Sequence, residues 1–334
     1  MRNEARQSLA LDLHDVHGYH GGRFAKFQMF NSDRAIDIMP NGMLKNGQPL
    51  RAYGTEMETE CNSISSSSVL AEVLHKVVFP NFKFGRTMFK VEEDGSLGGE
   101  TSAEIISQPM TKGRIRNDYK SYQAMFRYFR HLGIVADSQY TSCGMHVNVS
   151  NAVFGNTEPE QDEAIRKLYY VINRYFRFMC HLFKRPEDKT FWCDQMTADH
   201  LVHVEHSWAF GYNDAQHYDW HNAKNIDVRG SHVPSAHQNC LNLSHVREGR
   251  IEIRLVGGQP DFYAYRNTME CVFFLTENIG KLKWDDLEDL TKVFKGCNQY
   301  VTKRLTECIG CNGFTREMYD KIVDNLVQED LELR

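Results

Sequence analysis

Three glutamates at alternate positions, Glu56, Glu58 and Glu60, are the residues of this sequence whose spacing points most directly to chemistry. In a β-strand, residues two apart point to the same face, so a strand here sets the three carboxylates side by side. Like charges at this spacing repel one another unless a cation lies among them. Because carboxylate oxygens bind Mg²⁺, often together with substrate phosphates, the spacing indicates a metal site.

Three further segments alternate polar and apolar residues in the same way, and each indicates a short strand. Their polar positions carry groups that bind metal ions or phosphate: Glu104 in 102–107, His146 and Asn148 in 144–149, and Arg250, Glu252 and Arg254 in 250–255. Their apolar positions predict a buried face, formed by Val147, Val149, Ile251, Ile253 and Leu255. The four segments together predict a metal and nucleotide site on one face of a sheet.

The composition is typical of a soluble globular protein, with 334 residues of which 41% are hydrophobic and 25% charged. The net charge of −5 disfavours nucleic acid as a partner and leaves only a local basic groove open. No apolar run approaches the ~20 residues of a membrane span, and the first 20 residues lack a signal-peptide core. Nine cysteines at scattered spacing fit a reducing compartment, so we expect a cytoplasmic protein.

The sequence predicts three parts along the chain. Residues 1–50 form a lead-in with a hairpin, because two Asn-Gly pairs within it are turn signals. Residues 51–260 form the catalytic core, and residues 261–334 a helical part packed on that core. Periodicity predicts helices at 62–79, 118–132, 158–183, 261–283, 285–294, 298–309 and 315–328. Further strands are predicted at 86–92, 238–245 and 249–257, and a histidine-rich loop at 190–237.

The order of these motifs resembles that of the amidoligases, which belong to the carboxylate–amine ligase superfamily of glutamine synthetase and glutamate–cysteine ligase. The matching residues, in chain order, are Gly54, Glu56 and Glu58, then Asp94, Gly95 and Ser96, then Glu104, Ser107 and Pro109, then Gly144, His146 and Val147, then Leu241, Asn242 and Leu243, and finally Glu252 and Arg254. They span residues 51–257. The sequence departs from the family at Asn148, where a His is common, and at Ser107-Gln108-Pro109, where a tighter Ser-Pro is usual.

The resemblance implies an α+β fold, in which a curved, mainly antiparallel sheet forms a cup or half-barrel with helices packed outside. It also implies that ATP and two or more Mg²⁺ or Mn²⁺ ions bind in the cup. The expected metal ligands are Glu56, Glu58, Glu104, His146 and Glu252. By resemblance, Glu56, His146 and Glu252 hold the ion nearer the γ-phosphate, and Glu58 and Glu104 hold the ion at the reacting carboxylate.

The same resemblance gives roles to residues around these ligands. Arg254, together with Arg250, is expected to bind phosphate or a substrate carboxylate through the planar guanidinium fork, beside the catalytic Glu252. The expected contacts that orient ATP or substrate come from Asp94, Ser96 and Asn242.

The resemblance implies an ATP-dependent ligase that joins a carboxylate to an amine through an acyl phosphate. Catalysis of phosphoryl transfer is mostly positioning and charge neutralisation, which explains the need for cations and for carboxylates that hold them. The substrates are expected to be small-molecule or peptide carboxylates and amines. The sequence leaves open whether the protein forms a homo-oligomer. Three alternatives stay open as well: phosphotransfer to a guanidino group on the same fold, a catalytically silent binding protein and, more distantly, a metal-dependent hydrolase or nuclease.

Three other groups of residues have simpler interpretations. Cys308 and Cys311 lack a second cysteine pair, so we interpret them as free helical thiols rather than a zinc or redox site. Cys143 and His146 are three apart on a strand and therefore face opposite sides, which disfavours a nucleophile–base pair. The histidines of 190–237 are interpreted as loop and substrate-pocket residues.

Overall fold

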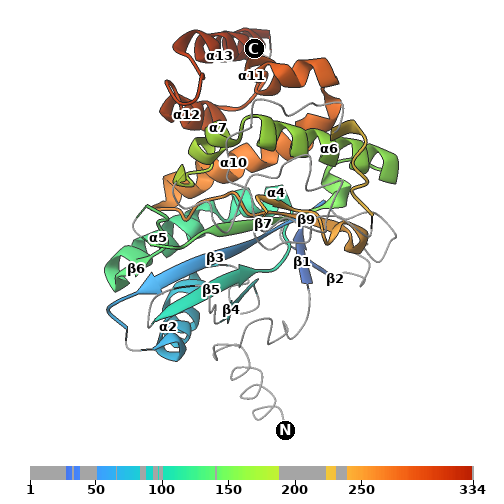
Figure 1. Cartoon of the computed structure of the whole chain (residues 1–334). Coiled ribbons are helices and arrows are strands. Elements are labelled where there is room, and N and C mark those ends of the chain that lie inside the picture. The colour runs from blue at the N-terminus through green and yellow to red at the C-terminus, as the bar shows by residue number, and fades with distance from the viewer. Residues whose placement is uncertain are drawn as a thin grey trace, which may run out of the picture. The chain divides into compact units, whose positions relative to one another are not determined.

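The computed structural model describes residues 28–31, 34–37, 51–64, 66–82, 88–92, 97, 101–139, 141–187, 223–230 and 239–332 (Figure 1). The chain forms two compact units, the first made of 1–148 and 257–265, the second of 149–256 and 266–334. The three-part division expected from the sequence stays a prediction. Within the described residues, no helix has the length and apolar character that a membrane crossing requires.

The first unit is built around β3 (Tyr53–Cys61), the strand that carries the alternate glutamates (Figure 1). On one side β3 pairs antiparallel with β5 (Ser102–Ser107), which in turn pairs antiparallel with β4 (Phe89–Glu92). On the other side its neighbour is β7 (Met145–Ser150), and the end of β3 also pairs antiparallel with β6 (Ile134–Val135). The expected strand positions at the site are therefore present.

The two faces of this sheet differ as the alternation predicts. Met57, Ile105 and Val91 lie opposite one another in the register of β3, β5 and β4, and all three are buried apolar residues. Because neighbours along a strand point to opposite faces, the glutamates of the same strands lie on the other face. The core side of the sheet thus fixes which side chains reach the polar side.

The helices of the first unit begin and end at recognisable signals. Before α2 (Ser67–Val73), the Ser66 side chain accepts a hydrogen bond from the Val69 N–H, and this cap explains why the helix begins later than residue 62. A short helix, α4 (Lys112–Asn117), leads into α5 (Tyr119–Leu132), which ends at the left-handed Gly133. The apolar stripe predicted for α5 is confirmed, because the buried residues are Tyr122, Met125, Phe126 and Phe129.

A close backbone approach at Gly258 fixes the segment that precedes β7. A Cβ atom on Gly258 would lie 2.2 Å from the carbonyl oxygen of Ala136 and 2.9 Å from that of Cys143, a space that only glycine fits. Beside it, Gly257 forms an antiparallel bridge with Gly144, the residue before β7.

Near the N-terminus, β1 (Gln28–Asn31) and β2 (Arg34–Asp37) form an antiparallel pair.

The second unit contains the end of β7, followed in the sheet by β9 (Arg250–Ile253) and β8 (Leu241–Asn242). The last two strands pair antiparallel, with Asn242 opposite Glu252. The apolar residues predicted for the buried side of these strands are confirmed, because Val149, Ile251, Ile253 and Leu255 are all buried. Its helices are α6 (Glu158–Arg174), α7 (Phe176–Leu182), most of α10 (Phe262–Asn278), α11 (Leu290–Val293), α12 (Gln299–Glu307) and α13 (Arg316–Glu332).

Several predicted elements have different lengths in the structure. The single helix expected over 158–183 is two helices, α6 and α7, separated at Tyr175 with φ −113° and ψ 34°. No Gly or Pro marks this break in the sequence, and the apolar periodicity continues across it. The pattern therefore predicted one continuous helix. The strand expected over 238–245 has only the two residues of β8, and the helix expected over 285–294 is a 3₁₀ turn followed by α11. The mixture of helices with an open antiparallel sheet is compatible with the α+β class, and the expected cup stays a prediction.

Candidate metal centre

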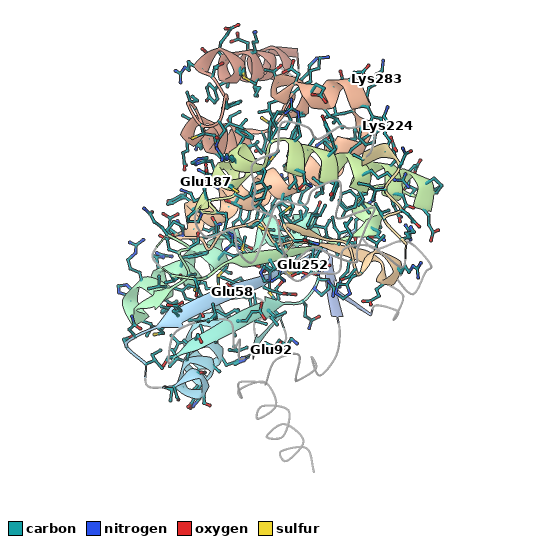
Figure 2. The ribbon with its side chains drawn as sticks, in the orientation of Figure 1. Glu58, Glu92, Glu187, Lys224, Glu252 and Lys283 are labelled. Atoms are coloured by element: carbon teal, nitrogen blue, oxygen red, sulfur yellow. The ribbon has the colours of Figure 1, made fainter. Side chains whose placement is uncertain are left out.

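Three glutamates form a row across β3, β5 and β4. The register sets Glu58 opposite Glu104 and Glu104 opposite Glu92, so all three side chains share one face. Each is buried, with exposed fractions of 7%, 5% and 1% respectively; Figure 2 labels Glu58 and Glu92. Like charges directly opposite each other destabilise a strand pair, so a nearby cation stabilises such a row.

His146 of β7 lies among the carboxylates of β3 and β5. Its Nδ1 atom is 3.5 Å from Glu56 Oε2 and 4.0 Å from Glu104 Oε1, and its Nε2 atom is 3.6 Å from Glu58 Oε1. These separations exceed a normal N–H···O hydrogen bond. Adjacent ligand atoms around a divalent ion are about 3 to 3.5 Å apart, given bonds of about 2.1 Å for Mg²⁺ to about 2.5 Å for Ca²⁺. The spacing around His146 is therefore close to that of ion ligands.

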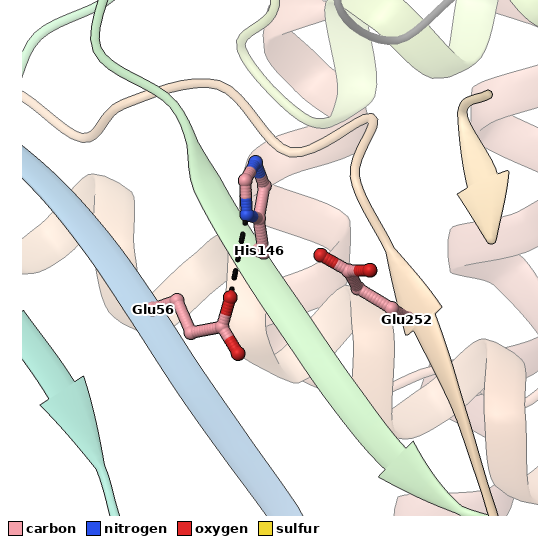
Figure 3. A group of neighbouring side chains, drawn as sticks. All are labelled: Glu56, His146 and Glu252. Carbon is pink, nitrogen blue, oxygen red and sulfur yellow. Dashed lines mark ion pairs between the residues drawn. The ribbon is translucent and has the colours of Figure 1, made fainter. Parts of the chain in front are cut away.

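Figure 3 shows the ion pair between His146 of β7 and Glu56 of β3, both in the first unit. Carboxylate oxygens are donors that suit Mg²⁺ or Mn²⁺, and the imidazole adds one nitrogen donor beside them. Glu252, the third residue in Figure 3, belongs to the second unit and is described there by itself.

Two of the carboxylates are oriented by hydrogen bonds to one oxygen each. The Asn148 Nδ2 group donates to Glu56 Oε1 at 2.7 Å, while the other oxygen, Oε2, faces His146. The backbone N–H of Gly144 donates to Glu58 Oε2, while Oε1 faces His146. Each carboxylate thus has one oxygen held by the protein and the other directed to the centre, as in metal sites whose ligands are fixed by outer partners.

Glu252 is held in the same manner within the second unit. Asn242 Nδ2 donates to Glu252 Oε2 and Arg254 Nη1 donates to Glu252 Oε1, both at 2.8 Å. Asn242 also accepts hydrogen bonds from the backbone N–H and the hydroxyl of Ser244. In the structure, Asn242 therefore orients a carboxylate, and its contact with ATP or substrate stays a prediction. Carboxylate oxygens carry further lone pairs, so Glu252 keeps the capacity to bind a cation.

Sequence reasoning missed Glu92 and its neighbour Lys90 on β4. Lys90 Nζ pairs with Glu92 Oε1, and both residues share the face of Glu104. The signal available in the sequence was the alternation of Lys90 and Glu92 within a segment predicted as a strand. The alternation indicates that the two side chains share a face of the strand. It does not indicate which residues of another strand lie opposite them, because the pairing with β5 depends on register.

The structure leaves the remaining predicted site residues in different situations. Arg250 is the half-buried first residue of β9, and Glu60 accepts a hydrogen bond from the Ser142 hydroxyl at 3.1 Å. Asp94 and Ser96 lie outside the described residues, as do the histidines of 190–237. Their expected roles stay predictions.

The cysteines considered from the sequence are free thiols. Cys143 is buried, and this burial raises its pKa to about 12, so it stays protonated and is a poor nucleophile at neutral pH. Cys308 is buried and Cys311 half-buried, and neither is in a disulfide. Burial likewise raises the pKa of Cys308 to about 12.

Comparison with known proteins gives a weak structural likeness that carries no argument about fold or activity. No family model matches the sequence, and no curated protein matches it. Among solved structures, the chain is similar to a bifunctional glutathione synthetase from Pasteurella multocida, with 12% sequence identity and a TM-score of 0.34. The likeness covers 83% of this chain and 48% of that one, so this chain spans about half the length of that protein. At this TM-score, the likeness carries no argument about activity.

Proposed function

We propose that this chain is an ATP- and Mg²⁺-dependent carboxylate–amine ligase. The observation that carries the proposal is the set of three glutamate carboxylates within 4.0 Å of His146 on one sheet face. Three carboxylates around one imidazole, with one oxygen each held by the protein at Glu56 and Glu58, are suited to divalent ions.

The proposal assigns the ligands to two ions. Glu56, His146 and Glu252 hold the first, and Glu58 and Glu104 hold the second, with Glu92 added from the register of β4 and β5. When bound, Mg²⁺ or Mn²⁺ would neutralise charge on phosphate oxygens and on the reacting carboxylate. Lys90 neutralises part of the charge on Glu92 before the ions bind.

The chemistry requires activation of the carboxylate, because oxide is a very poor leaving group. In the proposed reaction, a carboxylate oxygen attacks the γ-phosphorus of ATP, and the bond to ADP breaks. The amine then attacks the carbonyl carbon of the acyl phosphate, and inorganic phosphate leaves as the amide forms. Arg254 and Arg250 bind phosphate or carboxylate oxygens, while Asp94, Ser96 and Asn242 orient ATP or substrate.

The proposal includes membership of the amidoligase family, with a curved sheet that forms a cup around the site. The substrates are then a small-molecule or peptide carboxylate and an amine, and the protein works in the cytoplasm. This assignment rests on the motifs and on the geometry around His146, and not on the likeness to the glutathione synthetase.

The test is a screen of carboxylate and amine pairs for ADP release with Mg²⁺. We expect slow release with either substrate alone and faster release with both, because the acyl phosphate is consumed only when an amine attacks it. Hydroxylamine, added in place of the amine, should trap the activated carboxylate as a hydroxamate. A stable phosphorylated product without hydroxamate would instead show a guanidino-type phosphotransferase. Metal-dependent ATP binding without turnover would show a silent binding protein.

Two glutamate variants on β3 sharpen this test. Glu58→Gln removes a proposed ligand charge and should reduce ligation at least a hundredfold, since charge stabilisation dominates phosphoryl transfer. Glu60→Gln is the matched control, because Glu60 lies on the same strand, binds the Ser142 hydroxyl and has no proposed metal role. Equal activity of the two variants would contradict the assignment of Glu58.

A further inference from the structure

Two arginines meet where the second unit's β9 ends. Arg185, which follows α7, is 94% buried, as its exposed fraction is 6%. Its Nη2 group donates to the main-chain carbonyl oxygens of Arg254 at 3.0 Å and Val256 at 3.1 Å. Arg254 is the residue directly after β9, and its own Nη1 group donates to Glu252.

Both guanidinium groups keep donors that the protein does not use. The Nε atoms of Arg185 and Arg254 are buried and have no hydrogen-bond partner. Within the described part of the chain, no carboxylate forms an ion pair with Arg185, whose two hydrogen bonds go to neutral carbonyls. A guanidinium carries five N–H donors, and a buried charge without a counter-charge is costly. The hydrogen bonds of Arg185 therefore leave its guanidinium group only partly satisfied, which a purely structural role does not explain.

Arg304 of α12 is a buried arginine with a structural role, and the protein supplies all of its partners. Its exposed fraction is 4%, close to that of Arg185. Its Nε group donates to the carbonyl of Leu182 at 2.7 Å, and its Nη2 group donates to that of His181. Its Nη1 group pairs with the Glu307 carboxylate, so all three nitrogens have partners and the charge is matched. Arg185 has the carbonyl contacts of Arg304 without the carboxylate.

We propose that Arg185 and Arg254 bind a phosphate-type oxyanion at the end of β9. A phosphate group carries up to two negative charges and several acceptor oxygens, which suit two guanidinium groups with unused N–H donors. Arg254 pairs with Glu252, so the anion lies beside a carboxylate that the proposed function assigns to a metal ion. Resting on the proposed function, we identify this anion as a phosphate of the nucleotide.

The binding test uses metal-free protein in EDTA and pyrophosphate as the probe, measured by isothermal titration calorimetry. Arg185→Met should weaken pyrophosphate binding about tenfold or more, the effect of losing a charge-assisted hydrogen bond. Arg304→Met is the matched control and should bind pyrophosphate as the wild type does. Arg185→Lys, which keeps the charge and loses the fork, should fall between the two. Equal affinity of the wild type and Arg185→Met would overturn the proposal.

Thermal unfolding distinguishes a lost ligand contact from a damaged fold. Both Met variants should unfold at lower temperature, because each loses hydrogen bonds to main-chain carbonyls. Pyrophosphate should raise the unfolding temperature of the wild type and of Arg304→Met, and not that of Arg185→Met. Acetate serves as a second probe, and Arg185-dependent binding of acetate without pyrophosphate binding would overturn the phosphate assignment. The anion site and the ligase activity are tested independently, because pyrophosphate binding in EDTA requires no turnover.

Discussion

Buried charge occurs in two different arrangements within the first unit. At the start of α5, Arg114 and Asp118 form a closed pair, with Nε to Oδ2 at 2.7 Å and Nη2 to Oδ1 at 2.6 Å. Around His146, three glutamates lie at 3.5 to 4.0 Å from the imidazole nitrogens, too far for good hydrogen bonds. In the first arrangement, a guanidinium and a carboxylate pair directly. In the second, three carboxylates lie around a single imidazole.

The contrast separates a structural use of buried charge from a binding use. Two parallel hydrogen bonds between a guanidinium and a carboxylate pair the two charges directly and with fixed geometry. Carboxylates that lie close together repel one another, and a bound cation offsets this repulsion. The same reasoning distinguishes Arg304, whose charge is matched by Glu307, from Arg185.

The largest expected effect comes from breaking the closed pair. Asp118→Asn leaves the Arg114 guanidinium buried without its carboxylate, and we expect the free energy of unfolding to fall by about 3 to 5 kcal/mol. Urea denaturation measures this loss. Metal affinity should not change, because neither residue contacts the carboxylates around His146.

The control for that prediction replaces both partners by apolar residues of similar size. Arg114→Met combined with Asp118→Leu should cost much less than Asp118→Asn alone, since no charge is then left buried. A double variant as unstable as Asp118→Asn would show that packing, rather than the charge pair, stabilises this helix junction.

The opposite outcome is expected at the carboxylate row. In EDTA, Glu104→Gln should leave the stability unchanged or raise it by about 1 kcal/mol, because it removes repulsion between Glu104 and its cross-strand partners. With Mn²⁺ at a hundred times its dissociation constant, the wild type should gain about 2.7 kcal/mol, and the variant less. Thermal unfolding with Mn²⁺ and with EDTA measures both. A wild type that gains no stability from Mg²⁺ or Mn²⁺ would remove the basis for the metal centre.

The alternation of residues was enough to predict the faces of the strands. Glu56 and Glu58 share a face because β3 is a regular strand, and Val147 and Ile251 are buried as expected. Local periodicity contains this information, since the side-chain period of a strand is two. The stripe of α5 was predicted for the same reason, with the helical period instead.

Features that depend on distant partners could not be predicted in this way. Glu92 joins the row only through the register of β4 with β5, which no residue within either strand specifies. Arg185 meets carbonyls 69 and 71 residues further along the chain, and nothing near Arg185 in the sequence indicates this. The break at Tyr175 likewise has no local Gly or Pro signal. Asp94 and Ser96 stay predictions.

The smallest expected effect concerns Asn148, which contacts the centre only through another residue. Its Nδ2 group fixes Glu56 Oε1, so Asn148→Ala should allow the carboxylate to rotate and weaken metal binding about tenfold, as for other outer partners of metal ligands. Mg²⁺ and Mn²⁺ should lose affinity to a similar extent. Competition titration with Mn²⁺ measures this change, and stability in EDTA should fall by no more than about 1 kcal/mol.

Asn148→His sharpens the comparison, because a His is common at this position in the family that the sequence resembles. A second imidazole beside Glu56 adds a nitrogen donor to an oxygen-rich site, and imidazole favours Zn²⁺ over Mg²⁺. We therefore expect the ratio of Zn²⁺ to Mg²⁺ affinity to rise in Asn148→His and to stay near the wild-type ratio in Asn148→Ala. If both variants shift the ratio equally, Asn148 acts only by orienting Glu56, and the choice of ion lies with the carboxylates themselves.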